Sequence, residues 1–356
     1  MIHVTESFTL HIPLPLSCPK EKLLFFDIET TGLSAKNSMV YLIGCICQEE
    51  EGWKLTQYFC DDPGDEPELL NTFFSLLSSY SVLVHYNGDS FDIPFLKEKA
   101  RQLSVPQPFD TVKSLDLYKK IRPFKHLLGL SSLKQIAVEN LFHIRRADKK
   151  SGKELIAIYR NYVLFPSKDQ LELLLLHNHD DLTGLLGICK FFSFSELFSG
   201  NFTIDKASIL QDGPNTKLSV SFTCALPFED AYTYIHEGYS LSVAKDSCTL
   251  SIPIFEGELL YFYKDFKNYY YLPKEDTAIH KSVGAYIEPE FRKKATAATC
   301  YTKKQGNFLF QPKELFTPCF RKDYTSKELF FLCDDTFLNN SVALQKYVLA
   351  VLPIFL

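Results

Sequence analysis

The sequence predicts an α/β fold, in which a mixed sheet is flanked by helices, followed by a smaller β-rich α+β domain. Three observations predict it. Strand-like apolar segments alternate with helical patterns up to about residue 195, and short β-rich runs between turn residues follow after about residue 206. The length of 356 residues is enough for two domains. We therefore expect an N-terminal extension over 1–21, a first domain over 22–195 and a second domain over 206–356.

Strand–helix alternation indicates the mixed sheet of the first domain. Each expected strand is a short apolar run, whereas the expected helices carry apolar residues three and four positions apart. Three strands in succession, and then strands separated by helices, favour a mixed sheet with helices packed on its faces. The expected strands are 23–29, 39–48, 53–60, 81–87 and 114–118, and the expected helices are part of 88–103, together with 67–80, 130–142 and 168–192.

The second half of the chain has a β-rich texture. Its apolar runs are short, lie between turn residues and in part alternate with polar residues, as half-buried antiparallel strands do. A linker is expected near 195–206, weaker helical patterns at 291–300 and 341–349, and a buried terminal strand in VLAVLPIFL. The expected strands are 218–226, 239–244, 249–255, 259–266 and 268–273.

Composition excludes several classes of protein. With 46% hydrophobic and 23% charged residues, the chain is expected to fold rather than to be disordered. Its net charge of −5 means that a nucleic-acid partner needs a local basic patch or a bridging metal ion. Ten cysteines at irregular spacing, with no CxxC pair, favour a reduced cytoplasmic protein over a zinc protein. No apolar run reaches the roughly 18 residues of a membrane span, and no signal peptide is recognisable.

Two acids interrupt the first buried strand, in FFDIETT at 25–31. Asp27 and Glu29 are two positions apart, so their side chains face the same side of a strand, where like charges repel. The alternative is a strand end whose acids are solvated, but the surrounding phenylalanines and Ile28 favour burial. Buried carboxylates need a compensating partner, and a cation is the simplest one.

Two further polar clusters follow. In HYNGDSFDIPFL at 85–96, Asn87 and Asp92 flank a turn after a strand, and Asp92 begins a helix; plain helix capping is the alternative. In HNHDD, His177 and Asp181 are four positions apart and therefore neighbours on one helix face. Exposure of these polar residues is the alternative, although the cluster interrupts an otherwise apolar helix, where polar groups need partners.

As a set, these motifs resemble the DEDD 3′–5′ exonuclease superfamily, and within it the YprB-type ribonuclease-H-like domain. The resemblance covers roughly residues 22–192 and implies a ribonuclease-H-like fold with exonuclease activity. It also implies that the metal-binding acids are Asp27, Glu29, Asp92 and Asp181. Many DEDD enzymes have a tyrosine four positions before the last aspartate, whereas this chain has His177, a spacing that YprB-type domains share. Asp180 is an alternative to Asp181, but it lies about 100° away around the helix.

The acids and His177 suggest hydrolysis of a phosphodiester bond in DNA or RNA. Four carboxylates suit two divalent cations, Mg²⁺ or Mn²⁺, in a two-metal mechanism. His177 is the candidate general base or water-orienting residue, with a core histidine as the alternative. Two other functions stay open: a non-catalytic nucleic-acid-binding or adaptor module on the same fold, and a structure-selective endonuclease.

The expected partner is a nucleic acid, with a single-stranded 3′ end as the substrate. Basic segments at 119–126 and 143–146 are candidates for contacts to the phosphate backbone, although charged clusters are more often solvated faces. Aromatic and basic residues after position 268 fit single-strand binding, but lysines on exposed strand edges explain them as well. The candidate substrate-binding residues are Thr30, Asn87, Phe91, Asp116 and Arg145.

Overall fold

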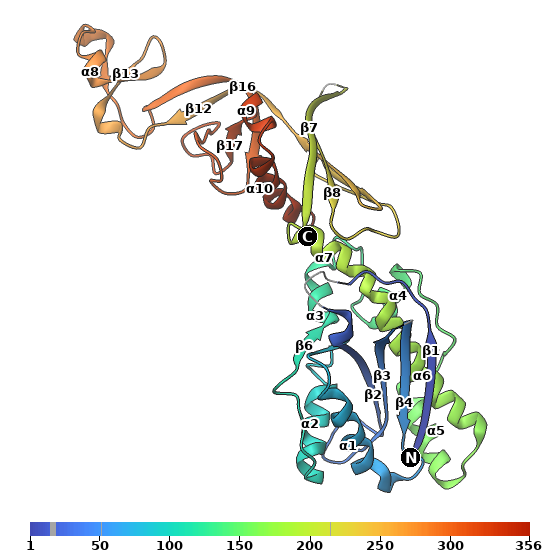
Figure 1. Cartoon of the computed structure of the whole chain (residues 1–356). Coiled ribbons are helices and arrows are strands. Elements are labelled where there is room, and N and C mark those ends of the chain that lie inside the picture. Colours follow the sequence, from blue (N-terminus) through green and yellow to red (C-terminus); the bar gives the residue numbers. More distant parts are fainter. Residues whose placement is uncertain (15–18, 51, 214) are drawn as a thin grey trace. The chain divides into compact units, whose positions relative to one another are not determined.

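The structure is a computed structural model that describes residues 1–14, 19–50, 52–213 and 215–356 (Figure 1). The chain divides into two compact units, Met1–Ser195 together with Leu356, and Glu196–Phe355. Within the described residues, none of the helices combines the length and the apolar character needed to cross a membrane. Nine cysteines in this part of the chain are free thiols, while Cys18 lies outside the described residues.

A six-stranded sheet forms the centre of the first unit, in the order β1-β4-β3-β2-β5-β6. β2 runs antiparallel to β3 and parallel to β5, and β5 runs parallel to β6, so the predicted mixed sheet is confirmed. The strands are β1 (Ile2–Phe8), β2 (Leu23–Thr30), β3 (Val40–Glu49), β4 (Gly52–Phe59), β5 (Val82–His85) and β6 (Lys113–Asp116).

The first strand lies in the segment that the sequence places outside the domain. Residues 2–8 pair along their whole length with β4, from Ile2 opposite Phe59 to Phe8 opposite Trp53. None of these seven residues is fully buried, so the strand is held at the sheet edge chiefly by backbone pairing. A strand of this kind leaves no clear apolar pattern, which is why hydrophobic periodicity does not find it.

Helices cover both faces of this sheet (Figure 1). Phe26 stacks on Phe73 of α1, with ring centroids 5.6 Å apart, whereas its neighbour Asp27 accepts a hydrogen bond from Asn178 of α6. Because neighbouring strand residues point to opposite faces, α1 and α6 pack on opposite sides of β2. The helices are α1 (Glu66–Leu77), α2 (Asp92–Leu103), α3 (Leu117–Ile121), α4 (Gln135–Leu141), α5 (Gly152–Leu164), α6 (Lys168–Ile188) and α7 (Phe192–Phe198).

Helix α5 was not expected, although its start carries a recognisable signal. Ser151 and Glu154 form a capping box, in which each side chain bonds the backbone N–H of the other residue. The helix then buries Leu155, Tyr159 and Tyr162 in the core of the unit. Tyr159 and Tyr162 flank the ring of Phe59 edge-on, so α5 closes the sheet near β4.

Gly44 lets α6 approach the sheet closely. It lies opposite Asp27 in the β2–β3 register. A Cβ atom at Gly44 would lie 2.0 Å from Asn178 Oδ1 and 2.5 Å from Leu182 Cδ1, so any other residue would displace these two buried side chains of α6. This close approach brings the polar face of α6 against the two acids of β2.

The second unit is β-rich, as predicted, and contains three antiparallel sheets. Their strand orders are β7-β8-β11-β10-β9, β12-β16-β17 and β14-β13-β15. The strands are β7 (Phe202–Asp212), β8 (Asn215–Cys224), β9 (Tyr232–His236), β10 (Tyr239–Ala244), β11 (Ser247–Pro253), β12 (Phe255–Phe262), β13 (Tyr269–Leu272), β14 (Thr277–His280), β15 (Lys293–Lys294), β16 (Tyr301–Gln311) and β17 (Leu329–Leu332), and the helices are α8 (Lys281–Gly284), α9 (Asp335–Leu338) and α10 (Ser341–Val351).

Two local expectations in this half are wrong. The terminal apolar run is not a strand, because it continues α10, which buries Leu344, Tyr347, Val348 and Val351 at helical spacing. The helix expected at 291–300 is absent, since that segment contains the short strand β15 and a turn. The division between the two units, between Ser195 and Glu196, lies at the start of the linker expected near 195–206, although α7 ends at Phe198 and β7 begins at Phe202.

Candidate active site

The candidate site lies at the carboxyl ends of three parallel strands. β2, β5 and β6 run in the same direction, and the polar residues expected to act lie near their carboxyl ends or just beyond them. Ligand sites of open α/β sheets are typically found at this edge. Asp27 and Glu29 of β2 face α6, as their spacing predicts.

Glu29, His177 and Asp181 converge. Nε2 of His177 lies 3.6 Å from Oε1 of Glu29 and 3.2 Å from Oδ2 of Asp181. One donor atom from each of the three residues lies within 4.8 Å of the other two, a spacing that suits a single metal ion. The side chains are 14–18% exposed, so the cluster is nearly closed but remains accessible.

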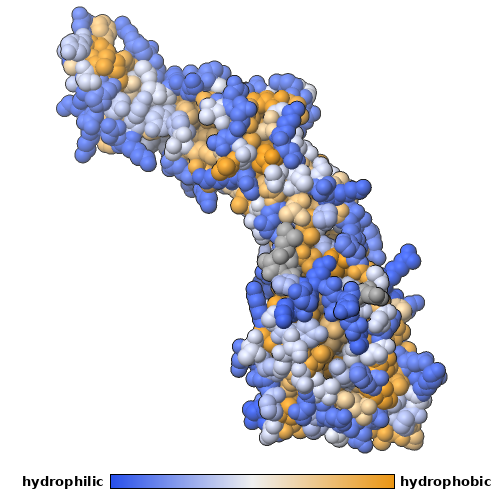
Figure 2. All heavy atoms as spheres, viewed as in Figure 1, coloured by the Kyte–Doolittle hydropathy of each residue, from blue (hydrophilic) through white to orange (hydrophobic). Residues whose placement is uncertain are grey.

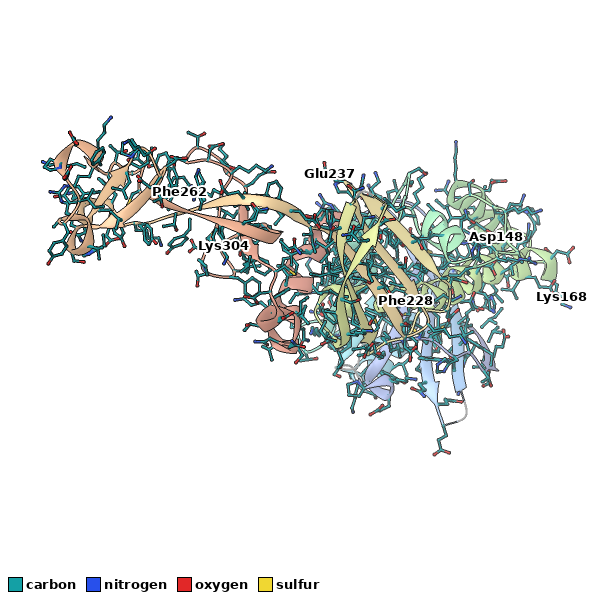
Figure 3. The ribbon with its side chains drawn as sticks, turned by 90° about the horizontal axis from the view of Figure 1, so that it is seen from above. Asp148, Lys168, Phe228, Glu237, Phe262 and Lys304 are labelled. Atoms are coloured by element: carbon teal, nitrogen blue, oxygen red, sulfur yellow. The ribbon has the colours of Figure 1, made fainter. Side chains whose placement is uncertain are left out.

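The imidazole of His177 is held from its other side by Asp148. Nδ1 of His177 lies 2.6 Å from Oδ2 of Asp148, a residue between α4 and α5 (Figure 3). The Asp148 segment is itself fixed by Asp180, which accepts hydrogen bonds from the backbone N–H groups of Ala147 and Asp148, both at 2.7 Å. Asp180 therefore anchors the loop that contains Asp148, while Asp181, the next residue on α6, faces the cluster.

Arg146 brings a positive charge into the site. Its Nη2 donates to Oδ1 of Asp181 at 2.5 Å, and its guanidinium forms two hydrogen bonds with Glu139, a fully buried residue of α4. Gln135, one turn earlier, donates to the backbone carbonyl of Asp181 at 2.8 Å. Asp181 is therefore fixed by α4 and by the loop that follows it.

Asp27 is anchored by a buried amide network. Nδ2 of Asn178 donates to Oδ2 of Asp27 at 2.9 Å, and Oδ1 of Asn178 accepts from Nε2 of Gln57 at 2.9 Å. Gln57 also donates to the backbone carbonyl of Leu175 at 2.8 Å. Because both amides are buried, the orientation of the Asp27 carboxylate is well defined.

Asp92 and Asp116 contribute two more buried acids. Asp92 begins α2 at the turn after β5, and Asp116 ends β6. Oδ1 of Asp116 accepts the backbone N–H groups of Asn87 and Tyr118, at 2.9 and 3.0 Å. Its Oδ2 atom is buried and has no hydrogen-bond partner among the described residues, although the residue is only 5% exposed. A water molecule or an ion can satisfy a buried carboxylate oxygen of this kind.

The acids of the site repel one another. Burial, followed by the charges of Asp181, Glu29 and Asp92, raises the pKa of Asp27 well above its usual value. Burial and the charges of Asp181 and Asp92 do the same to the pKa of Glu29. Burial raises the pKa of Asp92 to about 7, and it also raises the pKa of Asp181, although Arg146 opposes that shift. The cluster therefore holds more negative charge than its protein partners compensate.

Three of the expected substrate-binding residues lie outside this cluster. The Thr30 hydroxyl donates to the carbonyl of Gly32 and stabilises the turn after β2. Phe91 packs against Phe95 and the core. Arg145 is exposed, and the arginine that enters the site is the next residue along the chain.

An open pocket of about 490 Å³ is lined by two residues that hydrogen-bond to Asp116 and Asp181. Its lining includes Tyr86, Asn87, Tyr118 and Gln135. The rings of Tyr86 and Tyr118 meet edge-on, with centroids 6.0 Å apart. Gln135 connects the pocket with the site through the carbonyl of Asp181. Asn87, an expected substrate-binding residue, therefore lines the same pocket as two tyrosines that the sequence does not predict to bind substrate.

Comparison with known proteins agrees with this architecture. The family model described as RNase_H superfamily matches residues 24–192. The uncharacterized protein YprB of Bacillus subtilis (strain 168) is 30% identical over 177 residues, which are 48% of this chain and 41% of that protein. A DNA polymerase of Pyrococcus glycovorans is 30% identical over 107 residues, 27% of this chain and 14% of the polymerase.

Similarity to solved structures is more distant. A family B DNA polymerase from Pyrobaculum calidifontis aligns with a TM-score of 0.42 and 15% identity, covering 75% of this chain and 39% of the polymerase. The matches to the curated relatives span less than half of the length of those proteins. The family match and the mixed sheet with its flanking helices agree over the same segment. Residues 24–192 therefore form a ribonuclease-H-like domain.

Proposed function

We propose that this protein is a metal-dependent nuclease that removes nucleotides from the 3′ end of a nucleic-acid strand. The observation that carries the proposal is the convergence of Glu29, His177 and Asp181 to within 4.8 Å, beside the further buried acids Asp27 and Asp92. A ribonuclease-H-like fold supplies the context but does not by itself define the reaction.

The residues present fit divalent cations. The available donors are chiefly carboxylate oxygens, which Mg²⁺ and Mn²⁺ prefer. Asp27, Glu29, Asp92 and Asp181 carry raised pKa values because they are buried together, and a cation would relieve that repulsion. These four acids would hold the ions, while Nε2 of His177, which lies among them, would stay uncoordinated as the base. When bound, two divalent cations supply an activated water and positive charge for the leaving oxygen of a phosphodiester.

His177 is placed to handle the proton of the attacking water. Asp148 holds Nδ1 at 2.6 Å, which turns Nε2 toward the acids, 3.2 Å from Oδ2 of Asp181. Burial acts to raise the pKa of Asp148, but its hydrogen bond with His177 outweighs burial and lowers that pKa, which favours the ionised carboxylate as the partner that orients the imidazole. Arg146 offsets part of the charge of Asp181. The adjacent tyrosine-lined pocket is the proposed position of the terminal nucleotide.

The proposal is tested with strands labelled at the 5′ end. Linear single-stranded and double-stranded DNA and RNA are incubated with the protein in Mn²⁺ or Mg²⁺, with circular single strands that carry an internal label as the control. We expect linear single strands to shorten stepwise from the 3′ end and circles to stay intact. Cleavage of circles would instead indicate an endonuclease. Tight binding without cleavage of any strand would indicate a non-catalytic module and would contradict the proposal.

Loss of the Asp148 carboxylate is expected to act through His177. A positioned base contributes about 10²–10⁴-fold to a rate, so His177→Ala should lower kcat by that factor. Asp148→Asn should lower kcat by about 10–100-fold with little change in KM, because the imidazole loses its orientation. In the double variant, the second substitution should add almost nothing, which single-turnover rates can measure. Fully additive losses would show that Asp148 and His177 act independently.

A further inference from the structure

A second pocket, of about 570 Å³, lies in the second unit, and none of the acids of the candidate active site lines it. Aromatic side chains of β12 and of the segment after Phe320 line it, among them Tyr261, Phe262 and Tyr324. Phe262 meets Tyr324 with ring centroids 5.5 Å apart. The Tyr324 side chain is 47% exposed, so an aromatic face is open to a ligand at the rim.

The pocket is firmly built. Leu260 and Arg321 exchange two backbone hydrogen bonds, both 2.9 Å long, which fix the segment with Arg321 and Tyr324 against the edge of β12. On its other side, β12 pairs with β16 along eight residues. The aromatic rings are therefore held in position before any ligand arrives, which lowers the entropy cost of binding.

Two cations line this pocket without an acidic partner. In the part of the chain that the structure describes, neither Lys264 nor Arg321 forms an ion pair. Two nearby lysines, in contrast, form ion pairs. Lys303 pairs with Asp276 at 2.7 Å, and Lys322 pairs with Glu328 at 2.7 Å. The charges of Lys264 and Arg321 are thus available to an anion, although the acid Glu314 also borders the pocket.

The segment that surrounds this pocket, residues 261–325, is basic, whereas the whole chain is acidic. Residues 261–325 contain twelve lysines and arginines and seven acids, a net charge of +5, whereas the chain as a whole has −5. In Figure 2, hydrophilic residues surround a small hydrophobic group at the end that carries β13 and α8. Phe262 and Lys304 both lie on the β12–β16 ribbon (Figure 3). Aromatic residues are frequent too, with fifteen among these 65 positions.

We propose that this pocket binds single-stranded nucleic acid, with a base stacked on the exposed ring of Tyr324, which Phe262 supports edge-on, and with phosphates held by Arg321 and Lys264. Stacking on aromatic side chains beside a basic groove is the usual chemistry of sequence-tolerant single-strand binding. A local positive charge on an acidic chain favours a polyanion over an acidic protein surface of equal area, because a strand carries one phosphate per nucleotide. Strand binding at this pocket does not require nuclease activity. The inference rests on the proposed function in one respect, which is that the bound strand would be the substrate of the nuclease.

The test is strand binding by the full chain in EDTA, where cleavage is blocked. Fluorescent twelve-nucleotide oligo(dT) and oligo(U) are the probes, measured by anisotropy. Tyr324→Ala and Arg321→Gln should each weaken binding at least about fivefold. Arg321→Gln should also reduce the dependence of affinity on salt. Lys322→Gln is the matched control, because it removes a neighbouring charge that is already paired, and it should change affinity less than about twofold.

Either of two results would overturn the proposal. One is binding by Tyr324→Ala and Arg321→Gln as tight as that of the parent protein. The other is the absence of strand binding by the parent, which would favour a protein ligand for this pocket. Comparing oligo(dT) with oligo(U) separates DNA from RNA as the source of the strand. Failure of the proposed nuclease activity would be recognised separately, as strand binding in EDTA without cleavage after Mn²⁺ is added.

Discussion

Replacing Asp27 by Asn is expected to lower the rate of strand cleavage at least about a thousandfold. The substitution keeps the size of the side chain, and an amide oxygen can still accept the hydrogen bond from Asn178. It removes one of the negative charges that would hold the cations, and metal ions supply several kcal/mol of transition-state stabilisation. A loss of about 4 kcal/mol corresponds to a thousandfold lower rate. Cleavage of 5′-labelled single strands in Mn²⁺ measures it.

The matched control for this substitution is Asp169→Asn. Asp169 is an exposed acid in the first turn of α6, the helix that carries His177 and Asp181. Asp169→Asn removes one negative charge, as Asp27→Asn does, but it leaves the site intact. Cleavage should therefore stay within about twofold of the parent rate. Thermal unfolding shows whether each variant is folded. Parent-like cleavage by a folded Asp27→Asn protein would be incompatible with a catalytic role of these acids.

Without divalent cations, the protein is expected to lose stability as pH rises from about 4 to about 7. Burial raises the pKa of Asp92 from the usual 3.8 to about 7, so the folded protein keeps a proton that the unfolded chain releases. Because the folded state binds more protons in this range, its free energy of unfolding falls with increasing pH. Asp92 alone accounts for about 4 kcal/mol, since each pKa unit corresponds to about 1.4 kcal/mol.

The variant Asp92→Asn isolates this contribution. It carries no charge at any pH, so its Tm in EDTA should match that of the parent near pH 4 and exceed it by roughly 8–16 °C at pH 8. Adding Mn²⁺ at pH 8 should raise the Tm of the parent, because an ion that binds only the folded state stabilises it. Asp110→Asn, at an exposed position, is the control. An equal Tm difference between parent and Asp92→Asn at pH 4 and pH 8 would argue against a charge-strained site.

Periodicity predicted the part of the candidate site that lies on regular elements. Strand alternation places Asp27 and Glu29 on one face, and the four-residue spacing makes His177 and Asp181 neighbours. The fold brings Glu29 and Asp181 to the same histidine, although 151 residues separate them in the chain. The mixed sheet was predictable for the same reason, since each central strand is an apolar run.

The rest of the site depends on loop contacts that no spacing encodes. Arg146 and Asp148 lie between helices, and they enter the site because Asp180 binds the backbone of their loop. Arg145 and Arg146 are indistinguishable in sequence, and only the fold determines which of them meets Asp181. Asn178 could have been recognised as a polar residue on an apolar helix, but its partner Gln57 lies on a distant strand.

Titration of the metal-free protein with Mn²⁺ in a calorimeter tests the central claim most directly. The claim is that the acids of β2, α2 and α6 form a cation site. At pH 8 the parent should show saturable heats of binding, which the Asp27→Asn and Asp181→Asn variants lose while Asp169→Asn retains them. A parent protein that binds no Mn²⁺ at millimolar concentration, or an Asp181→Asn variant that binds it equally well, would contradict the account.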